Sequence, residues 1–285
     1  MTTIKLSNKT FSAAPKKYCR VVLTEEKPSW HRLVETTDGQ LEYRLGAGKA
    51  KNLTARAYRT LIRTIVQSVK SHQLEHIALE ITSTNYSQLA DKDETWFYRT
   101  LAENLQLAAY EFTFYKTKKK NQKQLKEVLV CGTLSKTAKS AFATGITVGE
   151  AANTTRDIAN TSGEDMTPSK LATASKNALK GTKATVKVLG IAEIKKAKMG
   201  LLEAVGKGAT DKPKLIIIEW WGAGKPTATD KKAGKKQPIA LIGKGITYDT
   251  GGLNVKPSGA MHEMHMDMSG GAAMIGTMRA IATLG

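Results

Sequence analysis

The stretch LIGKGITYDTGGLNVKP, residues 241–257, continues the apolar run PIALIG at 238–243. That run predicts a buried strand, and the residues after it place Lys244, Asp249 and Lys256 among glycines and apolar side chains. Burying an ammonium group costs free energy unless the group is paired or loses its proton. Lys244 therefore either forms a salt bridge to Asp249 or becomes a neutral amine that can bind a metal ion.

Strand and helix patterns alternate along the residues before this stretch. Apolar runs predict strands at 20–24, 41–46, 76–81, 127–132, 184–190 and 214–222. Helical spacing or capping residues predict helices at 54–70, 95–112, 136–160, 167–181, 191–198 and 268–285. This alternation is typical of α/β proteins. The sequence therefore predicts an N-terminal α/β domain at 1–134, a connecting helix at 135–165 and a second α/β domain at 166–285.

The chain of 285 residues has a net charge of +19, which is high for a metabolic enzyme. Excess positive charge favours nucleic acids or other anionic partners. The excess consists mainly of lysine, whereas arginine is the residue preferred for bidentate phosphate and base contacts. The run KTKKKNQKQLK at 116–126 is therefore either a solvated loop or a nucleic-acid patch.

The sequence also bears on the cellular compartment. Cys19 and Cys131 are the two cysteines, too few for a disulfide framework and suited to a reducing environment. The N-terminus lacks the apolar core of a signal peptide, and no run approaches the ~18 apolar residues of a membrane span. We expect a cytoplasmic protein without membrane contact.

The spacing of charged residues around the glycines indicates metal chemistry. Asp249 follows Lys244 after the short run GITY, Lys256 comes next, and Asp267 stands at the entry to a helix. Two carboxylates and a neutral amine can hold divalent cations, and a charged ammonium can serve an anionic transition state. This set suits a two-metal hydrolase, in which metals roughly 3.5–4 Å apart activate water and polarise a carbonyl.

The motif GKGITYDTGGLNVKPSGAMHEMHMDMSGG, residues 243–271, resembles the signature of the cytosol (leucyl) aminopeptidase family, the M17 metallopeptidases. A weaker likeness extends upstream through RDIANTSGEDMTPSKLA at 156–172. The resemblance implies an α/β metallopeptidase catalytic domain. It also implies a soluble exopeptidase that removes leucine-like N-terminal residues from peptides and assembles as a homo-oligomer, usually a hexamer.

The resemblance implies a role for each matching residue. Lys244 would bind one metal through its neutral amine, Asp249 would bridge two metals, and Asp267 would bind the metal that receives the substrate amine. Lys256 would stay charged and stabilise the gem-diolate. Met264 would line the pocket for the first substrate side chain, or simply pack in the core. Zn²⁺ or Mn²⁺ is expected, with Mg²⁺ or Co²⁺ as alternatives.

One part of the family pattern is missing. The second family signature, Asn-Thr-Asp-Ala-Glu-Gly-Arg, supplies two further carboxylate ligands and an arginine that holds a bicarbonate. The sequence ends at Gly285 before any such signature. We therefore expect the chain as written to be an incomplete and inactive fragment, with activity requiring residues beyond Gly285.

Other interpretations compete with the enzyme. The charge of +19 favours a basic nucleic-acid-binding protein on the same scaffold, although the sequence has no helix-turn-helix, RNP or zinc-finger pattern. Another interpretation is that the chain is a noncatalytic subunit of a mixed oligomer. His262 and His265 lack the H-E-x-x-H spacing and are expected in a polar loop of the cleft. Trp220 and Trp221 are expected to pack or to form a subunit interface.

Overall fold

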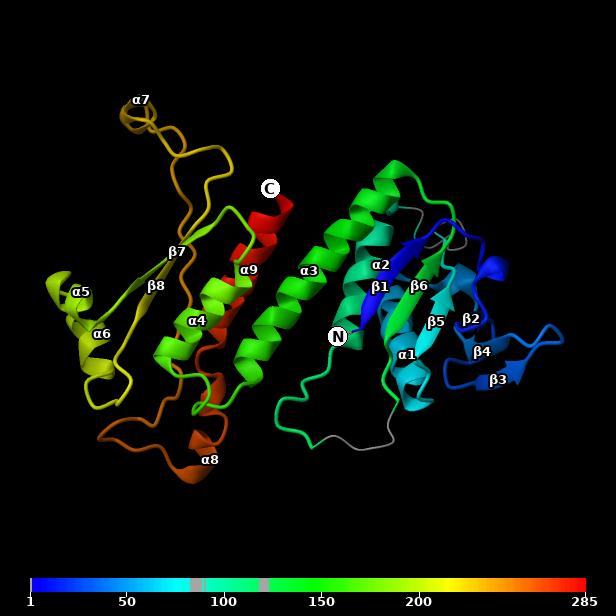
Figure 1. Cartoon of the computed structure of the whole chain (residues 1–285), viewed down its shortest axis with the longest axis horizontal. Coiled ribbons are helices and arrows are strands. Elements are labelled where there is room, and N and C mark those ends of the chain that lie inside the picture. The colour runs from blue at the N-terminus through cyan, green and yellow to red at the C-terminus, as the bar shows by residue number, and fades with distance from the viewer. Residues whose placement is uncertain (1, 83–88, 90, 118–122) are drawn as a thin grey trace. The chain divides into compact units, whose positions relative to one another are not determined.

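The computed structural model describes residues 2–82, 89, 91–117 and 123–285 (Figure 1). The chain divides into two compact units, residues 1–150 and 151–285. Helix α3 (Lys136–Asn160), predicted at these positions, runs through the division. The domain limits expected at 134 and 165 remain a prediction. Within the described residues, no helix is long and apolar enough to cross a membrane.

The N-terminal unit is built on a six-stranded sheet in the order β1-β6-β5-β2-β4-β3. The strands are β1 (Thr3–Ser7), β2 (Cys19–Thr24), β3 (His31–Glu35), β4 (Leu41–Gly46), β5 (His76–Leu79) and β6 (Glu127–Cys131). All neighbours pair in parallel except β3, which runs antiparallel to β4 along one edge. Four strands were predicted from their apolar runs, whereas β1 and β3 were not.

Helices α1 (Ala55–Ser71) and α2 (Glu94–Ala109) cover one face of this sheet (Figure 1). The side chain of Thr54 accepts a hydrogen bond from the amide of Ala57, so Thr54 is the N-cap of α1. Tyr58 of α1 stacks on Phe97 of α2 with ring centroids 4.6 Å apart. Both rings join the inward side chains of the strands in one apolar core.

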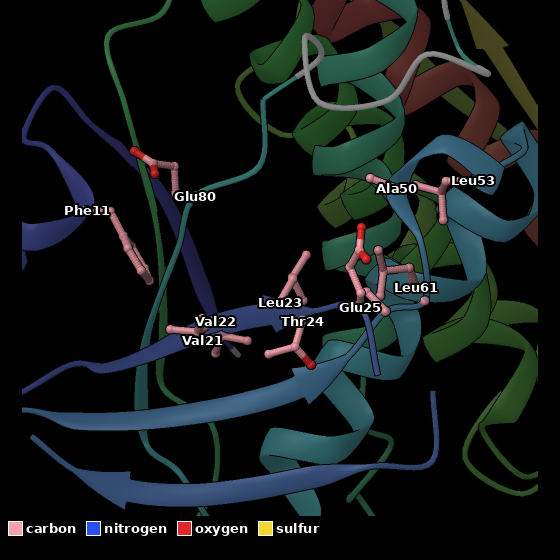
Figure 2. A pocket seen from close by; sticks show the side chains of 12 residues that line it. Phe11, Val21, Val22, Leu23, Thr24, Glu25, Ala50, Leu53, Leu61 and Glu80 are labelled. Carbon is pink, nitrogen blue, oxygen red and sulfur yellow. The ribbon is translucent and has the colours of Figure 1, made fainter. Parts of the chain in front are cut away.

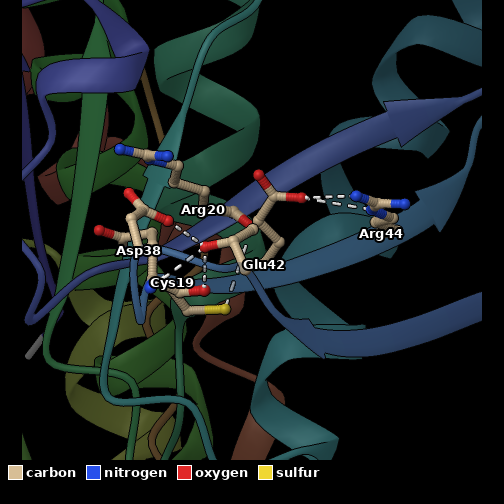
Figure 3. Close-up of polar contacts among 7 residues, drawn as sticks. Cys19, Arg20, Asp38, Glu42 and Arg44 are labelled. Carbon is tan, nitrogen blue, oxygen red and sulfur yellow. Dashed lines mark hydrogen bonds and ion pairs between the residues drawn. The ribbon is translucent and has the colours of Figure 1, made fainter.

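The other face of the sheet carries the chain between β1 and β2. Ala14 and Tyr18 pack there on Ala78 and Leu129. Neighbouring positions are charged: Glu42 and Arg44 form an ion pair of 3.1 Å, and Arg20 lies beside Glu42 in Figure 3. Cys19 points to the opposite, apolar face, where burial raises the pKa of its thiol to about 11. The cysteine is therefore an inert thiol.

The C-terminal unit contains a two-stranded antiparallel sheet of β7 (Thr185–Leu189) and β8 (Leu215–Glu219). Its helices are α4 (Pro168–Ala178), α5 (Ile191–Lys196), α6 (Gly200–Val205), α7 (Ala228–Lys232), α8 (Ser258–Met261) and α9 (Ser269–Leu284). A core cluster joins Leu171 of α4 to Met268 and Ile275. Gly276 lets α9 approach α3 closely, because a Cβ there would collide with Thr155.

The strand expected at 238–243 does not form, and that prediction is wrong. The segment has no regular secondary structure, and the side chains of Ile239 and Ile242 are 89% and 92% exposed. The segment pairs with no strand of the described residues, so no ladder of hydrogen bonds fixes it as a strand. The segment just before it, residues 223–237, is mostly exposed and contains the short helix α7.

Candidate metal centre

The glycine-rich loop after Lys244 is shaped by its backbone. Gly251 and Gly252 have φ angles of +87° and +68°, which side-chain-bearing residues rarely adopt. The amide of Gly251 donates a 2.9 Å hydrogen bond to Oδ1 of Asp249. The turn therefore fixes the carboxylate of Asp249 from within its own loop.

A second contact ties this loop to the start of α9. The amide of Gly271 donates a 2.6 Å hydrogen bond to the carbonyl oxygen of Lys244. Gly243 and Gly270 lie so close together that a Cβ on Gly243 would collide with the backbone of Gly270. The small residues at both places are what allows Lys244 to reach Asp267, which directly precedes the helix.

Two lysine–carboxylate pairs form the centre. Nζ of Lys244 donates to Oδ1 of Asp267 at 2.8 Å, and Nζ of Lys256 lies 3.2 Å from Oδ2 of Asp249. The hydrogen bond to Asp267 is the main cause that raises the pKa of Lys244, and the charge of Asp249 adds to it. The amide of Gly251 and then Lys256 lower the pKa of Asp249. Lys244 thus interacts with both carboxylates.

The structure corrects the sequence analysis of Lys244 on two points. Its ion-pair partner is Asp267, whereas the alternative without metal was a salt bridge to Asp249. Its side chain is also 53% exposed, so the argument from a buried ammonium does not hold. The reason is the missing strand at 238–243, because a segment that pairs with no strand does not carry the residue after it into the interior.

The main indication that a divalent metal ion could bind here is a buried oxygen atom of Asp267. Oδ2 of Asp267 is buried and has no hydrogen-bond partner in the described part of the chain. A buried carboxylate oxygen without a donor is costly, and a cation beside it removes that cost. Carboxylate oxygens and an amine nitrogen are ligands that Zn²⁺ and Mn²⁺ accept. Within the described residues, no group of three or more His, Cys, Asp and Glu is arranged to hold a metal, so the set here depends on Lys244.

The other residues singled out in the sequence take no part in these two pairs. Met264 begins a 3₁₀ turn (Met264–Met266) and is half-buried, and the same turn contains His265. His262 is exposed at the end of α8. Trp220 and Trp221 follow β8 and are half-buried.

Tyr248 is a positioning residue that sequence analysis missed. Its hydroxyl donates a 3.2 Å hydrogen bond to the carbonyl of Met261, which ties the loop next to Asp249 to α8. Its ring packs so closely on Gly163 that a Cβ there would come within 2.8 Å. The signal was a single aromatic residue within the run GITYDTGG.

The basic run at 116–126 falls partly outside the described residues, which omit 118–122. Nucleic-acid binding through that run therefore stays a prediction.

Two family models match the chain. The catalytic domain of the cytosol aminopeptidase family matches residues 153–285, and the N-terminal domain of the same family matches residues 43–119. A probable cytosol aminopeptidase of Ralstonia pickettii is 33% identical over 248 residues, which is 85% of this chain and 47% of that protein. One of Bdellovibrio bacteriovorus is 34% identical over 242 residues, 84% of this chain and 46% of that protein. The chain thus spans about half the length of these relatives.

Solved structures share the fold. The bottromycin maturation enzyme BotP in complex with Mn has a TM-score of 0.71 and 22% identity, with 94% of this chain and 56% of that chain covered. The cytosol aminopeptidase from Coxiella burnetii has a TM-score of 0.68 and 20% identity, with 98% and 57% covered. The predicted α/β fold is confirmed. From its two domain matches, this chain belongs to the cytosol aminopeptidase family.

Proposed function

We propose that the whole protein is a metal-dependent aminopeptidase that removes leucine-like residues from the N-termini of peptides. One observation carries the proposal: Asp249 and Asp267 are each paired with a lysine, and Oδ2 of Asp267 is buried without a donor in the described part of the chain. Membership in the cytosol aminopeptidase family supports the reaction class.

In this proposal Asp249, Asp267 and Lys244 hold two divalent metal ions. Bound metals supply an activated water and polarise the scissile carbonyl. Asp249 would help to hold both ions, since its carboxylate feels the charges of both lysines. Asp267 would hold the ion that receives the substrate amine, and Lys244 would contribute its own amine. Zn²⁺ and Mn²⁺ fit this mixture of oxygen and nitrogen donors better than Mg²⁺, with Co²⁺ as a further candidate.

Lys256 is the proposed catalytic residue that does not bind metal. Its ammonium lies 3.2 Å from Asp249 and its side chain is 30% exposed, so it can turn towards a substrate carbonyl. There it donates hydrogen bonds to the negative charge that develops on the carbonyl oxygen, which lowers the barrier. Half-buried Met264 offers an apolar wall for the first side chain of the peptide.

Family membership also supports a homohexamer in the cytoplasm and a bicarbonate that relays the proton, and we propose both for the whole protein. Light scattering measures the subunit number directly. Loss of activity in bicarbonate-free buffer, restored on adding bicarbonate, tests the relay.

The test of the main proposal pairs activity with metal content. Asp249→Asn and Asp267→Asn should each lower the Zn²⁺ or Mn²⁺ bound per subunit and the metal-dependent hydrolysis of Leu-p-nitroanilide. Glu263→Gln is the matched control, because Glu263 is an exposed acid of the same segment and takes part in neither pair. Unchanged metal content in both aspartate variants would refute the site.

A further inference from the structure

The N-terminal unit contains a cavity of about 270 Å³ that the aminopeptidase proposal does not use. Leu23, Thr24 and Glu25 line it at the carboxyl end of β2, and Glu80 lines it directly after β5. Figure 2 shows Glu80 and Phe11 on one side of the cavity and Glu25 on the other.

The position of the cavity in the sheet is significant. β2 and β5 are parallel neighbours, and the chain leaves them in opposite directions. After β2 it continues to β3 and β4 on one side, and after β5 it continues to β6 on the other. In open α/β sheets, ligands bind outside the carboxyl ends of strands at such a switch point. The cavity therefore lies where this architecture usually places a ligand.

The walls are mainly apolar. Leu53 and Leu61 face Phe11 across the cavity, and Val22 and Leu23 lie at its base in Figure 2. The volume is near the lower end of the range of about 300–1,000 Å³ that is usual for ligand pockets. A small ligand with an apolar body is the size and chemistry that fit.

The charged side chains that line the cavity indicate the charge of its ligand. Glu25 and Glu80 are the charged residues that line the cavity, and no Lys, Arg or His lines it in the described part of the chain. Neither glutamate forms an ion pair with another described residue. Two unpaired carboxylates at the cavity attract a cation and repel a phosphate.

We propose that this cavity binds a primary ammonium group carried on a small apolar body, with Glu25 and Glu80 supplying negative charge from its two sides. A free aliphatic amine and the N-terminus of a peptide with an apolar first residue both present this chemistry. The site is independent of the proposed metal centre, since it uses none of its residues.

The test is calorimetric titration of the 285-residue chain with isopentylamine. We expect saturable binding, with 3-methylbutan-1-ol, its uncharged counterpart, binding much more weakly. Glu25→Gln and Glu80→Gln should each weaken binding of the amine by about threefold, the usual scale for partly exposed charge pairs. Ala50→Leu should abolish binding, because Ala50 lines the cavity and a larger side chain fills it.

The matched control is Glu26→Gln, which removes a neighbouring exposed carboxylate that does not line the cavity. Competition by Leu-Gly-Gly, without competition by its N-acetyl form, would assign the site to peptide N-termini. Failure of both to compete with the amine would assign it to free amines. The proposal is overturned if isopentylamine shows no saturable binding, or if Glu25→Gln, Glu80→Gln and Ala50→Leu all bind it as the unmodified chain does.

Discussion

The segments LEYRLG at 41–46 and PIALIG at 238–243 were both predicted to be strands, but they adopt different structures. The first forms β4, lies between β2 and β3, and buries Tyr43 and Leu45. The second forms no strand and leaves Ile242 exposed. Its backbone pairs with no strand among the described residues, whereas β4 pairs with one on each side. An apolar run thus becomes a buried strand only where other strands can pair with its backbone.

A pair of isoleucine substitutions tests this comparison with the largest expected effect. Ile62 is fully buried in α1 and Ile242 is 92% exposed. Ile62→Ala should lower the free energy of unfolding by about 2–5 kcal/mol because it leaves a cavity. Ile242→Ala should change it by less than about 0.5 kcal/mol. Urea unfolding of both variants measures the difference. Equal losses would mean that 238–243 is packed in solution.

A pair of lysine substitutions tests the roles of the two lysine–carboxylate pairs in the whole protein. Lys256→Ala should keep its metals and lower kcat by roughly 10²–10³, as loss of an oxyanion donor does. Lys244→Ala should lose metal and make activity depend on added metal. Elemental analysis and kcat for both variants are the measurements. The opposite outcome, metal loss in Lys256→Ala alone, would show that the roles are exchanged.

Two N-cap substitutions compare the stability contributions of a packed helix and an exposed one. Thr54 caps the buried helix α1 and Thr227 caps the short, exposed helix α7. Thr54→Ala should lower the free energy of unfolding by about 1 kcal/mol. Thr227→Ala should leave it nearly unchanged, since α7 buries no residue. Thermal unfolding of the two variants separates them. A comparable loss for Thr227→Ala would indicate that α7 packs on the rest of its unit.

The smallest expected effect is on the free energy of unfolding at low pH. The hydrogen bond from Lys5, then that from Tyr18, lowers the pKa of Glu127 from 4.5 to about 2. Glu127 therefore stabilises the folded state above about pH 4.5, and this contribution is lost as the pH falls towards 2. The gain is below about 1 kcal/mol, since Lys5 and Lys17 are more than half exposed. Glu127→Gln should remove this part of the pH dependence of the urea midpoint.

A matched variant completes that test. Glu219→Gln changes an exposed glutamate at the end of β8 and should leave the acid limb unchanged. If the urea midpoint of Glu127→Gln falls at low pH as it does for the unmodified chain, the pair with Lys5 does not stabilise the fold.

Periodicity and caps predicted most of the fold. The helices at 136–160 and after Thr54 follow from their apolar spacing and capping residue. Strands β1 and β3 were missed because each carries few apolar residues and lies at an edge of the sheet. An edge strand is specified by its neighbour, and that information is not in its own sequence.

The motif predicted the members of the candidate site, but it did not predict their pairing. Lys244, Asp249, Lys256 and Asp267 were all named from their spacing, and the structure brings Lys244 to Asp267 and Lys256 to Asp249. Which lysine meets which carboxylate depends on the contact between Gly271 and Lys244, which spans many residues. No local pattern encodes such a contact.

The exposed apolar segment has a colloidal consequence. The molecule has a net charge of +19 and also exposes large apolar side chains to water, namely Ile239, Ile242 and Leu253. At low ionic strength the like charges of two such molecules repel each other, so their exposed apolar side chains rarely come into contact. Salt shortens the reach of that repulsion to about 10 Å at 0.1 M and leaves the apolar attraction intact. The chain should therefore self-associate more as salt is added, opposite to a protein held together by ion pairs.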